Sequence, residues 1–359
     1  TIQRSDLEEK ILDSPPMQRL RGIRQLAMAY LVYPGANHTR FEHSIGTLFL
    51  ADRICLELGV HPEKNQKVRM AALLHDVGHT AYSHEAEAIL QKKIGSHEEI
   101  GKHMTLKGEL ADTLSEQFSP REIAAVCSSP LGEIITSDIG ADRMDYLLRD
   151  SHYTGVAYGG IDSDRVCSSL ALDADGILLL ERGLSAAESL LVARFTMFST
   201  VYLHKTVRIA SRMLQQAIAL ALQDGTLDAE DSKQMSDAKM LETLVQSPEG
   251  REYAVRLSSR RLYKKARVVP MAKIKMRQGE AEELLSARCG CDVLVDIPKL
   301  SLETRIRLQT EAGKKVALSS ASELVASLQK MQASRLDALV MCEEKNAKKV
   351  SEVAKRLLG

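Results

Sequence analysis

Residues 73–84 of the chain read LLHDVGHTAYSH. The stretch holds an adjacent His–Asp pair and two further histidines, and another histidine follows it: His75, Asp76, His79, His84 and His97. A lone His–Asp pair is more often a packed histidine beside a surface carboxylate than a functional site. Four imidazoles so close together are hard to explain by packing, because most would be polar groups without partners in a small volume. The stretch therefore predicts a functional site.

The residue types in and around this stretch are those that bind a divalent cation. The candidate ligands are two imidazoles and two carboxylates: His43, His75, Asp76 and Asp142. Such a set leaves coordination positions for water and substrate, which is typical of catalytic metal sites. Neighbours on a helix point about 100° apart, so the adjacent pair can share an ion only at its common edge, and the other two ligands must come from other helices. The donors suit Fe, Mn, Mg, Zn or Ni and do not choose among them.

Composition and charge indicate a folded chain and imply no polyelectrolyte binding mode, although nucleic-acid binding stays possible. The chain has 359 residues, more than one domain usually needs, and 48 Lys+Arg balance 48 Asp+Glu. A net charge of zero does not indicate nucleic-acid binding, so a phosphate site would need a local basic cluster. No apolar run approaches the roughly 20 residues of a membrane span, and the first residues are polar. We therefore expect a cytoplasmic protein without a membrane partner.

Six cysteines lie far apart in the sequence, which favours a reducing compartment over a disulfide framework. Cys289 and Cys291 could form half of a metal site. No second Cys or His pair stands near them at zinc spacing, so we favour two ordinary buried thiols just before a strand.

The first 265 residues have a mainly helical pattern. Aromatic residues make up 4% of the chain and Trp is absent, which favours helix. Apolar residues recur with a 3.6-residue period, and we expect helices over 18–30, 41–58 and 67–78 and a long helix with one break over 186–223. One strand is expected at 176–181, after an Asp-Gly turn.

Short β-rich runs alternate with helical runs beyond residue 266. Strands are expected within 266–274, 291–298, 304–311, 314–320 and 337–342, and helices near 278–287, 321–331 and 344–358. Such interleaving suggests a small α+β domain. We expect a mainly α protein with a helical core at 1–265 and a smaller C-terminal α+β domain at 266–359.

Four segments resemble the signatures of the HD-domain superfamily: HTRFEHSIGT (38–47), LLHDVGHTAYSH (73–84), ADRMDYLLRD (141–150) and RFTMFSTVYLHKT (194–206). They are most similar to the deoxynucleoside triphosphate triphosphohydrolase branch, which includes the human sterile-alpha-motif/HD-domain enzyme. The resemblance covers about residues 6–265, in the same order and at compatible spacing. It implies a helical HD-domain core with metal-dependent phosphohydrolase activity.

By this resemblance, one divalent metal ion is held by His43, His75, Asp76 and Asp142. His97 stands where the family has a catalytic histidine, and Glu87 where it has an acidic partner. An imidazole held by a carboxylate can protonate the leaving 5′ oxygen, and such help is typically worth about 10²–10⁴-fold. His79 matches a position beside the α-phosphate, and His84 lies close to the same pocket. Which histidine is the general acid stays open.

The resemblance also assigns residues around the nucleotide. Arg40, Arg143 and Arg194 match positions that contact phosphates, and Lys205 follows nearby. A guanidinium binds phosphate oxygens in pairs, although each arginine alone could belong to a solvated helix face.

Sugar and base positions are matched as well. Asp150 would accept a hydrogen bond from the 3′-hydroxyl, and Tyr146 would pack where a 2′-hydroxyl needs room. Asp145 and Tyr146 could instead be ordinary helix surface and core. Further sugar and base neighbours are Gln25, Leu26 and Tyr202. One residue departs from the branch: Phe198 replaces a histidine one turn after Arg194, which removes a polar contact to the nucleotide.

A second, regulatory site is suggested by five residues. Asp13, Gln18 and Arg21 match positions that read the guanine of an activating nucleotide, and Arg260 and Lys264 resemble its phosphate-binding pair. Asp13 could instead cap a helix, and the basic run could be a solvated strand end. The site would be built between subunits, so it implies a homo-oligomer, a dimer or tetramer.

The sequence thus predicts hydrolysis of deoxynucleoside triphosphates to deoxynucleoside and inorganic triphosphate, with possible activation by a guanine nucleotide. One alternative is an HD-domain phosphodiesterase or nucleotidase that acts on other phosphate esters. Another is a non-catalytic module that senses nucleotides or binds nucleic acid.

Overall fold

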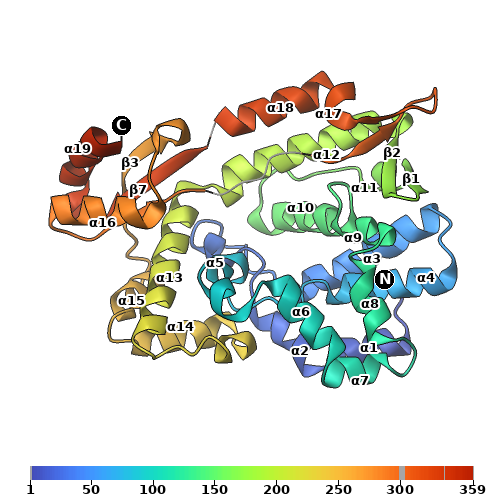
Figure 1. The fold of residues 1–359 in the computed structure, drawn as a ribbon, viewed down its shortest axis with the longest axis horizontal. Helices are drawn as coiled ribbons and strands as arrows, with labels where there is room; N and C mark the ends of the chain where they lie inside the picture. Colours follow the sequence, from blue (N-terminus) through green and yellow to red (C-terminus); the bar gives the residue numbers. More distant parts are fainter. Residues whose placement is uncertain (1, 299–303, 335, 359) are drawn as a thin grey trace.

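Helices dominate the fold, as the sequence predicts (Figure 1). The computed structural model describes residues 2–298, 304–334 and 336–358. The helices before residue 160 are α1 (Asp6–Asp13), α2 (Pro15–Arg19), α3 (Arg40–Glu57), α4 (Pro62–Leu74), α5 (Ser83–Ile94), α6 (His97–Leu106), α7 (Glu109–Leu114), α8 (Pro120–Val126), α9 (Glu133–Thr136) and α10 (Ala141–Thr154). Those after it are α11 (Ser163–Cys167), α12 (Leu184–Met197), α13 (Lys205–Gln223), α14 (Asp237–Gln246), α15 (Arg251–Ser258), α16 (Gln278–Cys289), α17 (Leu318–Ala321), α18 (Glu323–Ser334) and α19 (Ala347–Leu358). No helix among the described residues combines the length and the apolar character needed to cross a membrane.

Two small sheets complete the fold. The strands are β1 (Leu170–Asp173), β2 (Gly176–Leu180), β3 (Lys264–Pro270), β4 (Val293–Asp296), β5 (Arg307–Gln309), β6 (Lys315–Ala317) and β7 (Asp337–Cys342). One sheet has the order β1-β2-β5-β6, with β2 and β5 parallel, and the other has the antiparallel order β3-β7-β4. Of the strands in the first sheet, β1 was not expected from the sequence.

The expected C-terminal domain divides between these two sheets. The sheet β3-β7-β4 and helices α16 and α19 lie at one end of the molecule, whereas α17 and α18 extend along α12 (Figure 1). Leu308, Leu318 and Val325 pack into the same apolar core as α3 and α4. Segment 304–334 is therefore part of the helical body, and the boundary at residue 265 stays a prediction. Cys289 ends α16 and is buried as expected, whereas Cys291, which precedes β4, is only partly buried.

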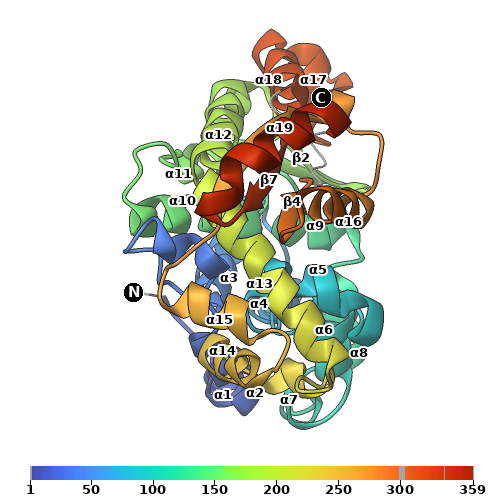
Figure 2. The ribbon, with the colours of Figure 1, turned by 90° about the vertical axis from the view of Figure 1, so that its left-hand side faces the viewer.

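The long expected helix over 186–223 has its predicted break. Helix α12 passes into a π-helical turn at Phe198–Tyr202, and α13 starts at Lys205. Such turns interrupt helices frequently at functional sites. Helix α13 then crosses the molecule between α5 and α15 (Figure 2).

The prediction of a single helix over residues 18–30 is wrong. Helix α2 ends at Arg19, a 3₁₀ turn covers Leu20–Gly22, and Arg24 forms a β-bridge with Thr39 before a second 3₁₀ turn at Ala27–Leu31. The apolar period is local, whereas the bridge to Thr39 is a tertiary contact that the period does not encode.

Candidate metal centre and active site

The ring of His43 is fully buried on α3 and has a fixed orientation. Its Nδ1 donates to Asp145 Oδ2 at 2.7 Å, and Arg149 holds Asp145 with bonds of 2.9 and 2.7 Å. A histidine whose Nδ1 carries the proton presents a lone pair at Nε2. That Nε2 lies 3.0 Å from Asp142 Oδ1 and has no hydrogen-bond partner among the described residues. Two acceptors at this distance need a proton or a cation between them.

The electrostatics of His43 agree with this requirement. Burial alone would lower the pKa of His43, but the neighbouring carboxylates of Asp142 and Asp145 outweigh burial and raise it to about 10. The carboxylates therefore attract positive charge to this position, whether a proton or a metal ion.

His75 and Asp76 follow directly after α4, which ends at Leu74 rather than near Gly78 as expected. His75 Nδ1 donates to the Ala72 carbonyl at 2.7 Å, so its Nε2 also carries a lone pair without a partner among the described residues. This Nε2 lies 3.4 Å from Asp76 Oδ1 and 3.7 Å from Asp142 Oδ1. The end of the helix thus lets both neighbours face the same point.

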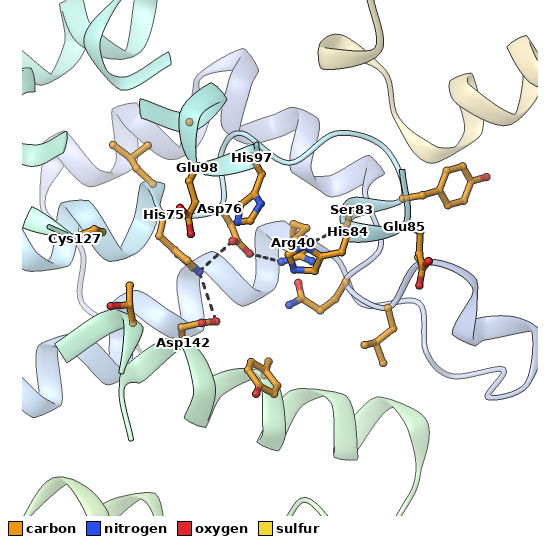
Figure 3. Close-up of a pocket in the computed structure, with 18 of the residues that line it drawn as sticks. Arg40, His75, Asp76, Ser83, His84, Glu85, His97, Glu98, Cys127 and Asp142 are labelled. Carbon is orange, nitrogen blue, oxygen red and sulfur yellow. Dashed lines mark hydrogen bonds and ion pairs between the residues drawn. The ribbon is translucent and has the colours of Figure 1, made fainter. Parts of the chain in front are cut away.

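These side chains converge from α3, from the turn that follows α4 and from α10, as Figure 3 shows for His75, Asp76 and Asp142. The ligand atoms of His43, His75 and Asp142 all lie within 4.8 Å of one another. Asp76 Oδ2 lies 3.6 Å from His43 Nε2 and also pairs with Arg40 Nη1 at 2.5 Å. The two buried, unpartnered Nε2 atoms beside carboxylate oxygens are the donor set that a divalent ion requires.

A second cluster contains the other predicted catalytic residues. His97 is the first residue of α6, whose start is fixed by a capping box between Ser96 and Glu99. Its Nδ1 lies 2.8 Å from Glu87 Oε1, and its ring stacks on His79 at 4.0 Å. His84, whose side chain is 65% exposed, lies 3.0 Å from the other Glu87 oxygen.

Burial and neighbouring charges shift the pKa values of Glu87 and His79 in this cluster. Burial would raise the pKa of Glu87, but hydrogen bonds from His84 and His97 outweigh it and hold that pKa below its usual range. Burial, and then the charge of Arg40, lower the pKa of His79. Glu87 is therefore ionised and orients His97. The ligand atoms of His79, His84, Glu87 and His97 are also close enough together to hold an ion.

A cavity of about 900 Å³ joins the two clusters. Its lining includes the following residues predicted from the sequence: Gln25, Leu26, Arg40, His75, Asp76, His84, His97, Asp142, Tyr146, Asp150 and Tyr202. Phe198 lines it too. The volume suits a ligand of nucleotide size, since such pockets are typically about 300–1,000 Å³.

Two of the predicted phosphate contacts lie elsewhere. Arg143 Nη1 and Arg194 Nη1 pair with the same oxygen, Asp138 Oδ1, at 3.1 and 3.3 Å. The other Asp138 oxygen accepts a hydrogen bond from the Arg305 backbone N–H at 2.8 Å. Neither these two arginines nor the exposed Lys205 is among the described residues that line the cavity. Tyr146, which does line it, lies close enough to both arginines to affect their pKa values.

The predicted regulatory residues form one local contact. Gln18 Oε1 accepts from Arg21 Nε at 2.8 Å, and Asp13 ends α1 nearby in the chain. Arg260 instead donates to the Leu31 carbonyl at 2.9 Å, and Lys264 is an exposed residue at the start of β3. The regulatory site and the oligomer that it implies stay predictions.

Several residues of the site had no assigned role in the sequence. His38 and Asp145 lie inside the recognised motifs, at positions where only their buried contacts indicate a role. Glu85, beside His84, lines the cavity, and Asp138 holds the arginine pair. A signal existed for Asp145, because it follows Asp142 by one helical turn.

Comparisons with known proteins identify the family of the chain and its relatives. The family model described as HD domain matches residues 40–150, and the model described as HD associated region matches residues 161–359. An uncharacterized protein of Methanocaldococcus jannaschii is 38% identical over 91% of this chain and 74% of its own length. The crystal structure of a hypothetical protein from Aquifex aeolicus superposes with a TM-score of 0.82 at 30% identity, covering 97% of this chain and 95% of that one.

A named relative is more distant. The deoxynucleoside triphosphate triphosphohydrolase homolog of Dictyostelium discoideum is 28% identical over 70% of this chain and 55% of its own length. The chain spans about half the length of this and several other curated relatives that it matches.

Proposed function

This chain belongs to the HD-domain family of phosphohydrolases, and from that premise we propose that it hydrolyses deoxynucleoside triphosphates to deoxynucleoside and inorganic triphosphate. The observation that carries the proposal is one cavity with two kinds of wall. One wall presents imidazoles and carboxylates that suit a metal ion, and the other presents Gln25, Tyr146, Asp150 and Tyr202, which suit a nucleoside.

The metal would be held by His43, His75, Asp76 and Asp142. When bound, a divalent ion at these residues polarises a phosphoryl oxygen and lowers the pKa of water, which gives a nucleophile at neutral pH. Asp145 and the Ala72 carbonyl support the site by fixing the tautomers of the two histidines. Arg40, already bonded to Asp76, would balance charge on the reacting phosphate.

The proton for the leaving group would come from His97. Glu87 accepts from its Nδ1, so the other ring nitrogen can face the substrate and deliver a proton to the 5′ oxygen. His79 stacks on the His97 ring and keeps its plane fixed. On this assignment Glu87 stays ionised through the cycle and stabilises the protonated imidazole.

The nucleoside would occupy the wall formed by α10 and the π-helical turn. Asp150 would accept from a sugar hydroxyl, and Tyr146 and Tyr202 would pack around the ring. Gln25 Oε1 is buried without a hydrogen-bond partner among the described residues, which suits an acceptor for the base or sugar. Phe198 adds only an apolar contact there.

Product analysis tests the proposal. The protein is incubated with dGTP and Mn²⁺ or Mg²⁺, and products are separated by anion-exchange chromatography. We expect deoxyguanosine and intact triphosphate in equal amounts, and none from the Asp76→Ala variant. Release of diphosphate or monophosphate in place of triphosphate would exclude this reaction.

One observation favours a second candidate, hydrolysis of other phosphate esters. Arg143 and Arg194 are paired with Asp138, so they are less available to a long phosphate chain than the sequence suggested. A substrate panel of dNTP, dNMP, cyclic nucleotide and a simple aryl phosphate separates the two reactions. Preferred turnover of the monoesters or cyclic esters would favour the second candidate.

A further inference from the structure

The carboxylate of Asp150 is held by two donors, one on each of its oxygens. His38 Nε2 donates to Asp150 Oδ1 at 2.7 Å, and the Tyr202 hydroxyl donates to Oδ2 at 2.6 Å. Side-chain exposure is 0% for His38 and 2% for Asp150. Asp150 and Tyr202 line the cavity, whereas His38 lies behind the carboxylate.

His38 is itself fixed from several directions. Its ring stacks on Tyr153 with centroids 4.7 Å apart and an interplanar angle of 18°. Its carbonyl accepts from the Gln25 N–H at 3.0 Å, so the same residue orders a second part of the cavity lining. Gly35 allows this loop to approach α10, because a Cβ there would lie 2.4 Å from the Tyr153 carbonyl oxygen.

Among the residues that the structure describes, the ring makes one polar side-chain contact, the one to Asp150. His38 Nδ1 has no hydrogen-bond partner among the described residues. A buried imidazole with one nitrogen unsatisfied costs stability, so packing alone does not account for it. An apolar ring of the same size would stack on Tyr153 equally well.

The hydrogen bond from His38 affects which lone pairs of the Asp150 carboxylate remain free for a ligand. An ionised carboxylate accepts about four hydrogen bonds, and two positions are taken by His38 and Tyr202. Fixing both oxygens sets the direction of the other lone pairs, which can then accept a hydroxyl proton from a ligand in the cavity. A site built to bond a hydroxyl rejects the analogue that lacks it, because the buried acceptor is left unpaired.

We propose that His38 is a positioning residue that orients Asp150 to select nucleosides carrying a sugar 3′-hydroxyl. The proposal rests on the proposed function for the nature of the ligand and adds the residue that sets its selectivity. The His38 side chain does not line the cavity, so its imidazole acts through Asp150.

The test compares two ring replacements in one binding experiment. His38→Phe keeps the ring that stacks on Tyr153 and removes the donor, and His38→Gln keeps a donor near the position of Nε2. Calorimetry measures the Kd of 2′-deoxyguanosine and of 2′,3′-dideoxyguanosine for the wild type and each variant. We expect the wild type to prefer the 3′-hydroxyl compound by about tenfold, His38→Phe to lose that preference, and His38→Gln to keep most of it. Binding of the dideoxy compound should be unchanged throughout.

Either of two results overturns the proposal: a wild type that binds both nucleosides alike, or a His38→Phe protein that keeps the full preference. If His38→Phe does not fold, as judged by thermal melting, His38→Asn replaces it, since its amide is too short to reach Asp150. Nucleoside binding is measured without turnover. If dGTP released no triphosphate, the proposed reaction would be excluded, and the binding experiment would still test whether His38 sets the preference for the 3′-hydroxyl.

Discussion

The imidazole of His43 donates from Nδ1 to the carboxylate of Asp145 at 2.7 Å, and both side chains are buried. This bond fixes which ring nitrogen faces the candidate metal centre. A carboxylate that orients a ligating histidine also raises the basicity of that histidine.

Replacing Asp145 should therefore weaken metal binding without touching a ligand. For Asp145→Asn we expect a metal affinity lower by about 10–100-fold, measured by metal content after dialysis against buffered free Mn²⁺. Asp112→Asn, an exposed aspartate on α7, is the matched control and should retain full metal. Equal occupancy in both variants would show that Asp145 does not support the site.

The His97–Glu87 contact predicts a loss of rate rather than of binding. His97→Gln should lower kcat by about 10²–10⁴-fold with a small change in KM, because it removes the proposed proton donor. Glu87→Gln should lower kcat less, since the imidazole stays but loses its charged partner. The control is His103→Gln, an exposed histidine on the same helix. A His97 variant that loses substrate affinity but keeps its kcat would contradict the assignment.

The shared contact of Arg143 and Arg194 predicts that Asp138 limits anion binding. Asp138→Asn should increase the affinity for inorganic triphosphate by about three- to tenfold, because a charged competitor for both guanidinium groups is removed. Calorimetry measures this directly. Asp173→Asn changes the net charge equally and also removes a carboxylate shared by two cations, Arg307 and Lys315, so it is the matched control. The same gain in both variants would indicate a general charge effect.

Local sequence signals predicted much of this protein. The apolar periods predicted α3, most of α4 and the interrupted pair α12 and α13, because each of these helices buries one stripe of residues. The adjacent histidine and aspartate at 75 and 76, together with the motifs, indicated which side chains would meet. The mainly α fold and the HD-domain family are both confirmed.

What the sequence did not predict depends on contacts between distant segments. Strand β5 pairs with β2 across more than a hundred residues, and neither strand encodes its partner. The pairing of both arginines with Asp138 is equally non-local, and a motif match cannot detect a competing carboxylate. Helices α5 and α6 are short, and their ends are set by Gly95 and the Ser96 cap rather than by an apolar period.

Gly78 in the HDVGH segment has a packing role that can be tested. A Cβ at this position would lie 2.1 Å from the His97 carbonyl oxygen and 2.3 Å from the Gly101 N–H. Gly78→Ala should therefore displace α6 and lower the free energy of unfolding by about 2–4 kcal/mol, measured by guanidinium chloride titration. Gly160→Ala, where a Cβ meets nothing within 4 Å, is the control and should be near neutral. Equal stability of the two variants would exclude close packing at Gly78.

Glu85 predicts how stability depends on pH. Burial, together with the charge of Asp296, raises the pKa of Glu85 to about 7, although a hydrogen bond from Gln215 at 3.1 Å opposes the shift. The folded state then holds a proton that the unfolded state, with a carboxyl pKa of about 4.3, has already released. Stability from this group is fully present below pH 4 and is lost as the pH rises through 7, by up to about 3–4 kcal/mol.

Denaturant titrations between pH 5 and pH 8 test this slope. Glu85→Gln has no proton to lose, so its stability relative to the wild type should increase over that range and level off above pH 7. Glu99→Gln on α6 is the control. The Glu99 carboxylate is exposed, and the oxygen of a glutamine can still accept the hydrogen bond from the Ser96 N–H. A difference between wild type and Glu85→Gln that stays constant from pH 5 to pH 8 would show that Glu85 is ionised in the folded protein throughout.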